Sequence, residues 1–370
     1  MSNLNNIYNR QLRGSVGNGV NRFFFSNLWN KFKPCLLKSF VLKFKRLACL
    51  NCFLQVLLFA FACTLTQSCN KNQPTCGEYA PDVPYTNPVW HPSGTFLGFN
   101  RKPLKSIFND ASLCGGYSYS YYDDSIGYWF INKDDSNLRR VLNYQLLNPS
   151  WSPDGKWIAF CNGGNIYKMS FDGINFDTTS LINLTTNGAS NFFPAWNANG
   201  DTIYYDSNKA TPPGGSFYAI WKMAADGSGQ TLITKDLQAG GREPFFKSTD
   251  EILFISFVNQ QEQVFAMDTN GDNIRQITSN LNAANRSEKQ FPQAYNGNIF
   301  FEDGGVWKIS DHGSNLLQLN DSSVEGFSIS KNGEIAWVNY NFGNIDKIQG
   351  TLWLMNSDGT NKKQITFNNY

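Results

Sequence analysis

The sequence predicts an all-β fold, a six-bladed β-propeller of four-stranded antiparallel blades over residues 85–370. Two observations predict this fold: a short phrase recurs six times, and a second phrase that follows each copy also recurs. The first phrase runs from a proline or glycine through a large apolar residue and an Asx/Ser-Gly turn into an alternating apolar strand. Repeats of this size determine the fold, and the place of every other residue follows from its position in the repeat.

The first phrase is fullest at Pro149–Phe160, which contains Trp151 and the turn Asp154-Gly155. Alternating apolar residues on both sides of the turn indicate two strands, each with one buried face. Weaker copies begin at Pro88, Pro194, Pro244, Pro292 and Gly326.

The second phrase is clearest at Ile166–Met169, with a turn at Asp172-Gly173 and a closing pair Leu184-Thr185. Asx-Gly between apolar runs is a strong hairpin signal, and we expect type I′ turns with positive φ at both central residues. Each repeat is therefore two hairpins, or four strands A to D, and such blades stack around an axis. The equivalent strands are Tyr128–Ile131, Ile220–Met223, Val264–Met267, Val306–Ile309 and Leu352–Met355.

The combination of Pro149–Phe160, Ile166–Met169 and Asp172-Gly173 resembles the WD40-like (PD40) repeat of the TolB-type propeller family, over about residues 85–368. The resemblance implies six blades and a role in docking envelope proteins, as TolB-type propellers do in the Tol-Pal system. The chain departs from TolB, since only about 18 residues separate Cys69 from the first repeat, too few for the α/β domain of TolB.

Residues 1–68 are expected to be a basic leader with a lipoprotein signal, and residues 69–84 a short linker. No Asp or Glu precedes Glu78, whereas nine of the 31 Lys and Arg residues precede Leu47. The remaining 22 basic residues against all 29 acids give residues 69–370 a formal charge of −7, which argues against nucleic-acid binding.

Leu47–Leu65 is an uncharged, mostly apolar run that follows a basic segment and precedes Thr66–Ser68. This order is typical of a secretory signal. It resembles a loose bacterial lipobox, in which Cys69 becomes the lipidated first residue. Cleavage before Cys63, ordinary cleavage and an uncleaved membrane helix remain alternatives.

On the two leading interpretations, a lipoprotein and an uncleaved membrane helix, the propeller lies outside the cytoplasm and is held at a membrane. The first of these predicts an outer-membrane lipoprotein that faces the periplasm or the cell surface. The long leader suggests a true translation start near Leu36 or Val41.

Of eight cysteines, four lie in the leader. Cys76 and Cys114 can pair in an oxidising compartment. Cys161 ends an apolar strand and is expected to be a buried free thiol. No zinc-type spacing occurs.

A catalytic constellation is not found in the sequence. Its two histidines, His91 and His312, replace turn residues, and no Gly-x-Ser-x-Gly elbow is present. Asp268–Asp272 imitates a calcium loop but coincides with a predicted hairpin turn. We therefore expect no enzyme activity, no cofactor and no metal.

The expected binding surface is the face of the B–C and D–A loops, because residues 101–127 form a long B–C insertion in the first blade. The expected function is that of a monomeric scaffold for an unidentified envelope protein. The alternative is carbohydrate binding or processing, with carboxylates beside aromatic rings. The candidate residues are Tyr117, Tyr119, Tyr121, Tyr122, Asp123 and Asp124.

Overall fold

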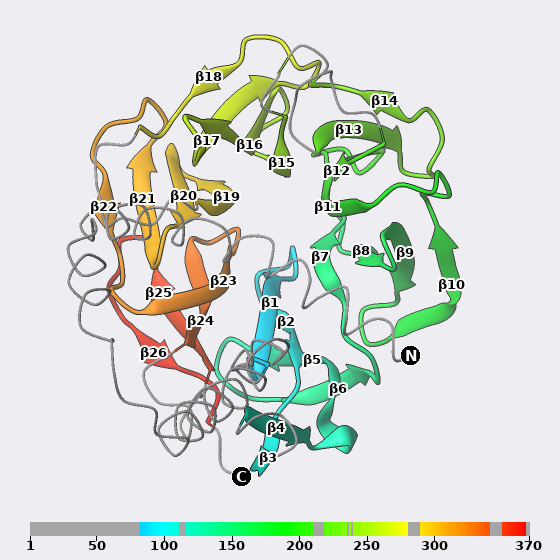
Figure 1. Ribbon diagram of the computed structural model, residues 1–370, viewed down its shortest axis with the longest axis vertical. Coiled ribbons are helices and arrows are strands. Elements are labelled where there is room, and N and C mark those ends of the chain that lie inside the picture. The colour runs from blue at the N-terminus through cyan, green and yellow to red at the C-terminus, as the bar shows by residue number, and fades with distance from the viewer. Residues whose placement is uncertain are drawn as a thin grey trace, which may run out of the picture. The chain divides into compact units, whose positions relative to one another are not determined.

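The computed structural model describes residues 82–110, 116–209, 218–234, 237, 240–279, 289–340 and 350–367. These residues form six four-stranded antiparallel sheets around a central axis, together with one two-stranded sheet (Figure 1). Contacts group residues 80–108 and 118–370 into one compact unit, which is the propeller. Within the described ranges, no helix has the length and apolar character needed to cross a membrane. The predicted six-bladed propeller is confirmed.

Every blade follows the same order, with strand A next to the axis and strand D at the rim. The A strands are β1 (Tyr85–Trp90), β7 (Leu147–Trp151), β11 (Asn191–Trp196), β15 (Arg242–Phe246), β19 (Gln290–Tyr295) and β23 (Ser323–Ile329). The B strands are β2 (Phe96–Arg101), β8 (Trp157–Asn162), β12 (Thr202–Ser207), β16 (Glu251–Val258), β20 (Asn298–Glu302) and β24 (Glu334–Tyr340).

The two outer positions are less regular. The C strands are β5 (Gly127–Asn132), β9 (Asn165–Phe171), β13 (Ala219–Ala224), β17 (Gln261–Asp268), β21 (Val306–Ser310) and β25 (Thr351–Asn356). The D strands are β6 (Arg139–Leu142), β10 (Phe176–Asn183), β14 (Thr231–Leu232), β18 (Arg275–Gln276), β22 (Leu317–Gln318) and β26 (Lys363–Gln364).

The core of the described residues consists of six apolar clusters, one at each seam between neighbouring blades. Trp151 and Trp196 are buried in two of these seams, as the repeat predicts for blade-packing residues. Burial of such large rings between sheets supplies most of the stabilisation. A single blade has no neighbouring sheet against which to bury them.

The ring closes by packing rather than by strand exchange. Blade 1 consists of β1, β2, β5 and β6, and blade 6 consists of β23 to β26, so each blade is continuous in sequence. The seam between them buries Leu97, Phe99, Val338 and Leu352. The backbone N–H of Trp90 also donates to Ser328 Oγ at 3.2 Å across this seam.

A β-bulge interrupts every A strand after its first residues. In blades 1 to 5 the repeat proline occupies the second bulge position, where a residue without an N–H breaks no ladder bond. The bulge holds one residue of each A strand in the left-handed region, at φ values between 48° and 90°. These residues are Asn87, Asn148, Phe193, Glu243, Phe291 and Gly326.

The recurring Ile-Thr pair has a hydrogen-bonding role. In blade 3, Thr234 Oγ1 accepts a backbone N–H near the start of strand C, from Ile220, at 2.9 Å. Asn320 Oδ1 has the same role in blade 5, where it accepts from Val306. Each cap satisfies a backbone donor that the short D strand does not reach. Equivalent caps are made by Thr185, Thr278 and Thr366.

The hairpins lie where the sequence places them, but the type I′ prediction is wrong at most of these turns. At Asp154-Gly155 only the glycine has positive φ, of 70°, and its N–H donates to Ser152 O at 2.9 Å. This is a type I turn followed by a left-handed glycine, which needs one positive φ rather than two. Asn296-Gly297 is an exception, with φ values of 47° and 72°.

Candidate interaction face

The long B–C insertion of blade 1 is a hairpin of β3 (Leu104–Asp110) and β4 (Gly116–Tyr121), followed by the 3-10 turn η2 (Asp123–Ser125). Ser106 Oγ and Ser120 Oγ lie 2.5 Å apart across the hairpin. We call the described residues of this insertion, 104–110 and 116–125, the aromatic hairpin. It emerges on the loop face, meaning the face of the B–C and D–A loops.

The predicted tyrosines of the aromatic hairpin differ in their surroundings. Tyr121 is partly buried, because Lys102 Nζ lies 4.2 Å from its ring centroid and the backbone N–H of Asp82 donates to its hydroxyl at 2.9 Å. Burial and the nearby Asp82 charge raise the pKa of Tyr121. Tyr122 is 37% exposed and has Lys105 Nζ at 5.9 Å from its ring centroid. Tyr119 is half-buried.

Asp123 and Asp124 are exposed on the turn η2. The turn is held in place by Arg140, which donates to the backbone oxygen of Asp124 at 2.6 Å, and by the indole of Trp129, which donates to Ser125 O at 3.0 Å. The two carboxylates therefore lie in solvent on an anchored turn. The side chain of Tyr117 lies outside the described residues.

A second group of polar side chains lies near the axis on the same face. The A-strand bulges and the ends of the B strands both lie near the loop face, because strand A starts there and strand B ends there. In each of blades 3 to 6, one of these two positions carries an acid: the B-strand end in blades 3 and 5, and the A-strand bulge in blades 4 and 6. We call these four residues the carboxylate arc: Asp206, Glu243, Glu302 and Glu325.

Three acids of the arc accept hydrogen bonds from backbone N–H groups of the next blade. Asp206 Oδ2 accepts from Glu243 N at 3.2 Å, and Glu243 Oε2 accepts from Phe291 N at 2.7 Å. Glu302 accepts from the backbone N–H of Gly326. In blades 4 to 6 the bulge leaves a donor without a ladder partner, and a carboxylate of the preceding blade satisfies it. One role of the arc is thus to join blades 3 to 6.

Burial raises the pKa of every acid in the arc. It raises the pKa of Asp206 to about 7, although the N–H of Glu243 and the charge of Arg242 act in the opposite direction. Burial also raises the pKa of Glu243, and it raises the pKa of Glu325 to about 7. For Glu302, burial and the charges of Glu325 and Glu243 together raise the pKa well above its ordinary range. Desolvation and mutual repulsion both disfavour the ionised form.

Blades 1 and 2 use neutral groups at the equivalent position. Asn100 Nδ2 donates to Leu146 O at 2.6 Å, and Leu146 N donates to Asn100 Oδ1 at 2.8 Å. The buried Cys161 sulfur accepts from the backbone N–H of Phe193. Cys161 is a buried free thiol, as predicted, and burial raises its pKa. The position therefore joins blades with or without charge.

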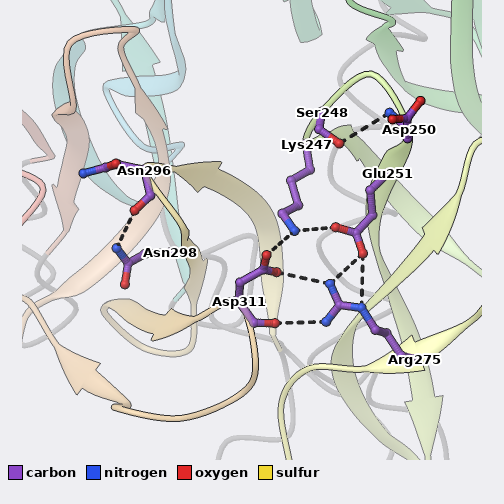
Figure 2. A network of polar contacts seen from close by, with 8 residues as sticks. All are labelled: Lys247, Ser248, Asp250, Glu251, Arg275, Asn296, Asn298 and Asp311. Atoms are coloured by element: carbon purple, nitrogen blue, oxygen red, sulfur yellow. Dashed lines mark hydrogen bonds and ion pairs between the residues drawn. The ribbon is translucent and has the colours of Figure 1, made fainter.

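A different charged cluster lies on the opposite face, at the seam of blades 4 and 5 (Figure 2). Arg275 bonds Glu251 Oε1 at 2.6 Å and Asp311 Oδ1 at 3.1 Å, and Lys247 bonds both acids. The hydrogen bonds from Lys247 and Arg275 outweigh burial and lower the pKa of Asp311. We call these four residues the seam network.

The other predicted chemical groups have structural surroundings or fall outside the described ranges. His91 stacks on Phe96 with a centroid distance of 4.4 Å, and its Nε2 lies 3.2 Å from Gly155 O. Among the described residues, no group of three or more His, Cys, Asp or Glu side chains is arranged to hold a metal ion. Cys69, Cys76 and Cys114 lie outside the described residues, so their predicted lipidation and disulfide stay predictions.

No protein-family model matches the chain, and no curated protein matches it. Among solved structures, it is similar to a putative TolB from Agrobacterium tumefaciens, with a TM-score of 0.52, 18% identity and coverage of 64% of this chain and 86% of that one. TolB from Acinetobacter baumannii gives a TM-score of 0.53 and 14% identity, covering 73% of this chain and 63% of that one.

These likenesses show a TolB-like propeller fold, and this chain spans less than two thirds of the Acinetobacter protein. A puromycin-hydrolysing peptidase from Mycobacterium tuberculosis is also similar, with 11% identity and coverage of 81% of this chain and 57% of that one. Its TM-score of 0.47 is too low to carry an argument about activity.

Proposed function

We propose that this chain is a propeller held outside the cytoplasm by a lipid on Cys69, and that it binds another envelope protein and catalyses no reaction. The observation that supports binding is the loop face, where the aromatic hairpin and the carboxylate arc lie on one side of a rigid ring of blades. Loops and exposed aromatic groups on a rigid scaffold are typical recognition surfaces. The TolB-like fold fits this role without establishing it.

Partner recovery tests the binding role. Full-length tagged protein is purified from detergent-solubilised membranes, and co-purifying proteins are quantified by mass spectrometry. We expect replacement of residues 106–125 by a short glycine-serine linker to reduce recovery of a specific partner at least tenfold. A matched double variant on the opposite face, Asp226→Ala with Asp358→Ala, is expected to retain it. Equal recovery with and without the aromatic hairpin would contradict the assignment of the loop face.

Membrane attachment has a separate test. Intact-mass analysis is expected to find a diacylglyceryl group on Cys69 with residues 1–68 removed, and Cys69→Ala is expected to abolish the modification. An unmodified thiol within an intact leader would show that the anchor is not a lipid.

Glycan binding is the second candidate, because the exposed acids of η2 adjoin the partly exposed ring of Tyr122. Retention of the protein on envelope polysaccharide, lost on Asp123→Asn with Asp124→Asn, would favour this role over protein binding.

A further inference from the structure

Two carboxylate oxygens of the arc lack a hydrogen-bond donor within the described residues. Asp206 is only 1% exposed, and its Oδ1 has no hydrogen-bond partner there, although the carboxylate accepts from the backbone N–H groups of Glu243 and Phe192. Oε2 of Glu302 is likewise enclosed without a partner. An enclosed polar atom without a partner is costly, so a donor that reached either oxygen would be bound favourably.

The cationic side chains near the arc already form ion pairs with other acids. Arg242 adjoins Asp206 and Glu243, but its guanidinium forms an ion pair with the buried Glu262. Lys289 forms an ion pair with Asp303 at 3.4 Å, and Asp303 adds negative charge beside Glu302. The other titratable groups facing Asp206 are Tyr218 and Cys161, which are both neutral at pH 7. The acids of the arc therefore have no cation of their own among these neighbours.

The spacing of the arc fits an organic cation better than a metal ion. Its acids are spread over four blades, and the described residues hold no group of three or more His, Cys, Asp or Glu side chains arranged to hold a metal ion. A guanidinium has five N–H donors and an ammonium has three, so either can bond several separated carboxylate oxygens. Charge-assisted bonds of this kind are the strong ones in a poorly hydrated site.

We propose that the carboxylate arc binds one cationic side chain, the guanidinium of an arginine or the ammonium of a lysine, which a protein partner inserts at the axis on the loop face. This inference rests on the proposed function, because a protein partner supplies the cation. It adds the chemistry of recognition: the partner carries an exposed basic residue in the segment that contacts the loop face.

Binding of a cation is linked to proton release. The acids of the arc have raised pKa values, so part of the arc is protonated at pH 6, whereas a bound cation favours the ionised form. Affinity is therefore expected to rise from pH 6 to pH 8, and binding at pH 6.5 is expected to release protons into the buffer.

A pair of isosteric probes isolates the charge. Full-length protein in detergent, at low salt and pH 8, is titrated with butylguanidinium and with neutral butylurea, and binding is followed by calorimetry. We expect one butylguanidinium per protein and at least tenfold weaker binding of butylurea. Glu325→Gln is expected to weaken butylguanidinium about tenfold. Asp250→Asn, an exposed acid on the opposite face, is the matched control and is expected to bind as the wild type does.

Several outcomes overturn the inference: no butylguanidinium binding, equal binding of butylurea, or unchanged affinity in Glu325→Gln. Glu325 is the preferred site for the test, because burial is the one cause of its raised pKa and no backbone hydrogen bond acts on it. Asp206→Asn gives a second measurement if that variant folds. Failure here leaves the proposed function standing if deletion of the aromatic hairpin still removes the partner. The reverse result, probe binding without any partner loss, contradicts the proposed function alone.

Discussion

The carboxylate arc and the seam network are both charged groups that join blades, but they differ in compensation. In the seam network two cations face two acids, and the pKa of Asp311 is lowered. In the arc the nearby cations, Arg242 and Lys289, are each already paired with an acid outside the arc, and the pKa values of the four arc acids are raised. The acids of the seam network are neutralised by cations of the chain itself. The acids of the arc can be neutralised only by a proton or by a bound cation.

The pH dependence of stability gives the largest expected difference between the two clusters. In the folded chain the carboxyl of Asp206 keeps its proton up to about pH 7. In the unfolded chain the same carboxyl loses its proton near pH 3.8. The native state then binds more protons between these values, so stability falls as pH rises, by up to about 4 kcal/mol for this group.

Asp206→Asn is expected to remove that part of the pH dependence, because an amide oxygen still accepts from the backbone of Glu243. Urea unfolding at pH 4.5 and 7.5 measures the change. Identical pH dependence in the variant and the wild type would show that Asp206 titrates normally.

Loss of a neutral partner at the same structural position sharpens the comparison. Asn100→Ala removes two hydrogen bonds to the backbone of Leu146 at a site that is 3% exposed. We expect a loss of about 3 kcal/mol of unfolding free energy at every pH, because two buried backbone groups lose their partners. Asn270→Ala, on an exposed turn, is the control and is expected to change the free energy by less than about 0.5 kcal/mol.

The seam network is expected to give a smaller and salt-dependent effect. Glu251→Gln leaves Lys247 and Arg275 with Asp311 alone, and the expected loss is about 1–2 kcal/mol because these side chains are partly exposed. Added salt should reduce the difference between variant and wild type. Asp250→Asn, one residue away and exposed, should unfold as the wild type does. A salt-independent loss would point to packing rather than charge.

The smallest expected effect is that of a single neutral cap, which serves as a reference for both clusters. Thr234→Val keeps the shape of the side chain and removes the acceptor for the N–H of Ile220, with an expected loss of about 1 kcal/mol. Thr231→Val on the exposed edge strand β14 is the control. Equal stability of the two variants would show that the Ile-Thr repeat reflects packing of the isoleucine alone.

The repeats were enough to place the hairpins and the large seam residues, because both depend on local turn chemistry and on alternation along one strand. Trp151, Trp196 and Cys161 could be predicted as core on this basis. The turn type could not, since type I and type I′ loops both accept Asx-Gly. The insertion of blade 1 was also visible, as a break in the repeat, but the packing of Tyr121 against Lys102 was not.

The carboxylate arc was missed because its members hold no common place in the repeated phrase. Asp206 and Glu302 end B strands, whereas Glu243 and Glu325 lie in A-strand bulges. For two of the four a usable signal was present, namely an acid directly before the repeat proline or glycine, as in Glu243-Pro244 and Glu325-Gly326. Without the ring, however, nothing relates residues that are about a hundred positions apart.

By itself, the sequence determined that six two-hairpin units of one kind exist and which faces of their strands are apolar, since these properties are local in the chain. Only the tertiary structure decided which side chains meet at the axis and whether their charges are balanced. The reason is that closing the ring removes water from groups supplied by different blades, and desolvation depends on all the neighbours at once.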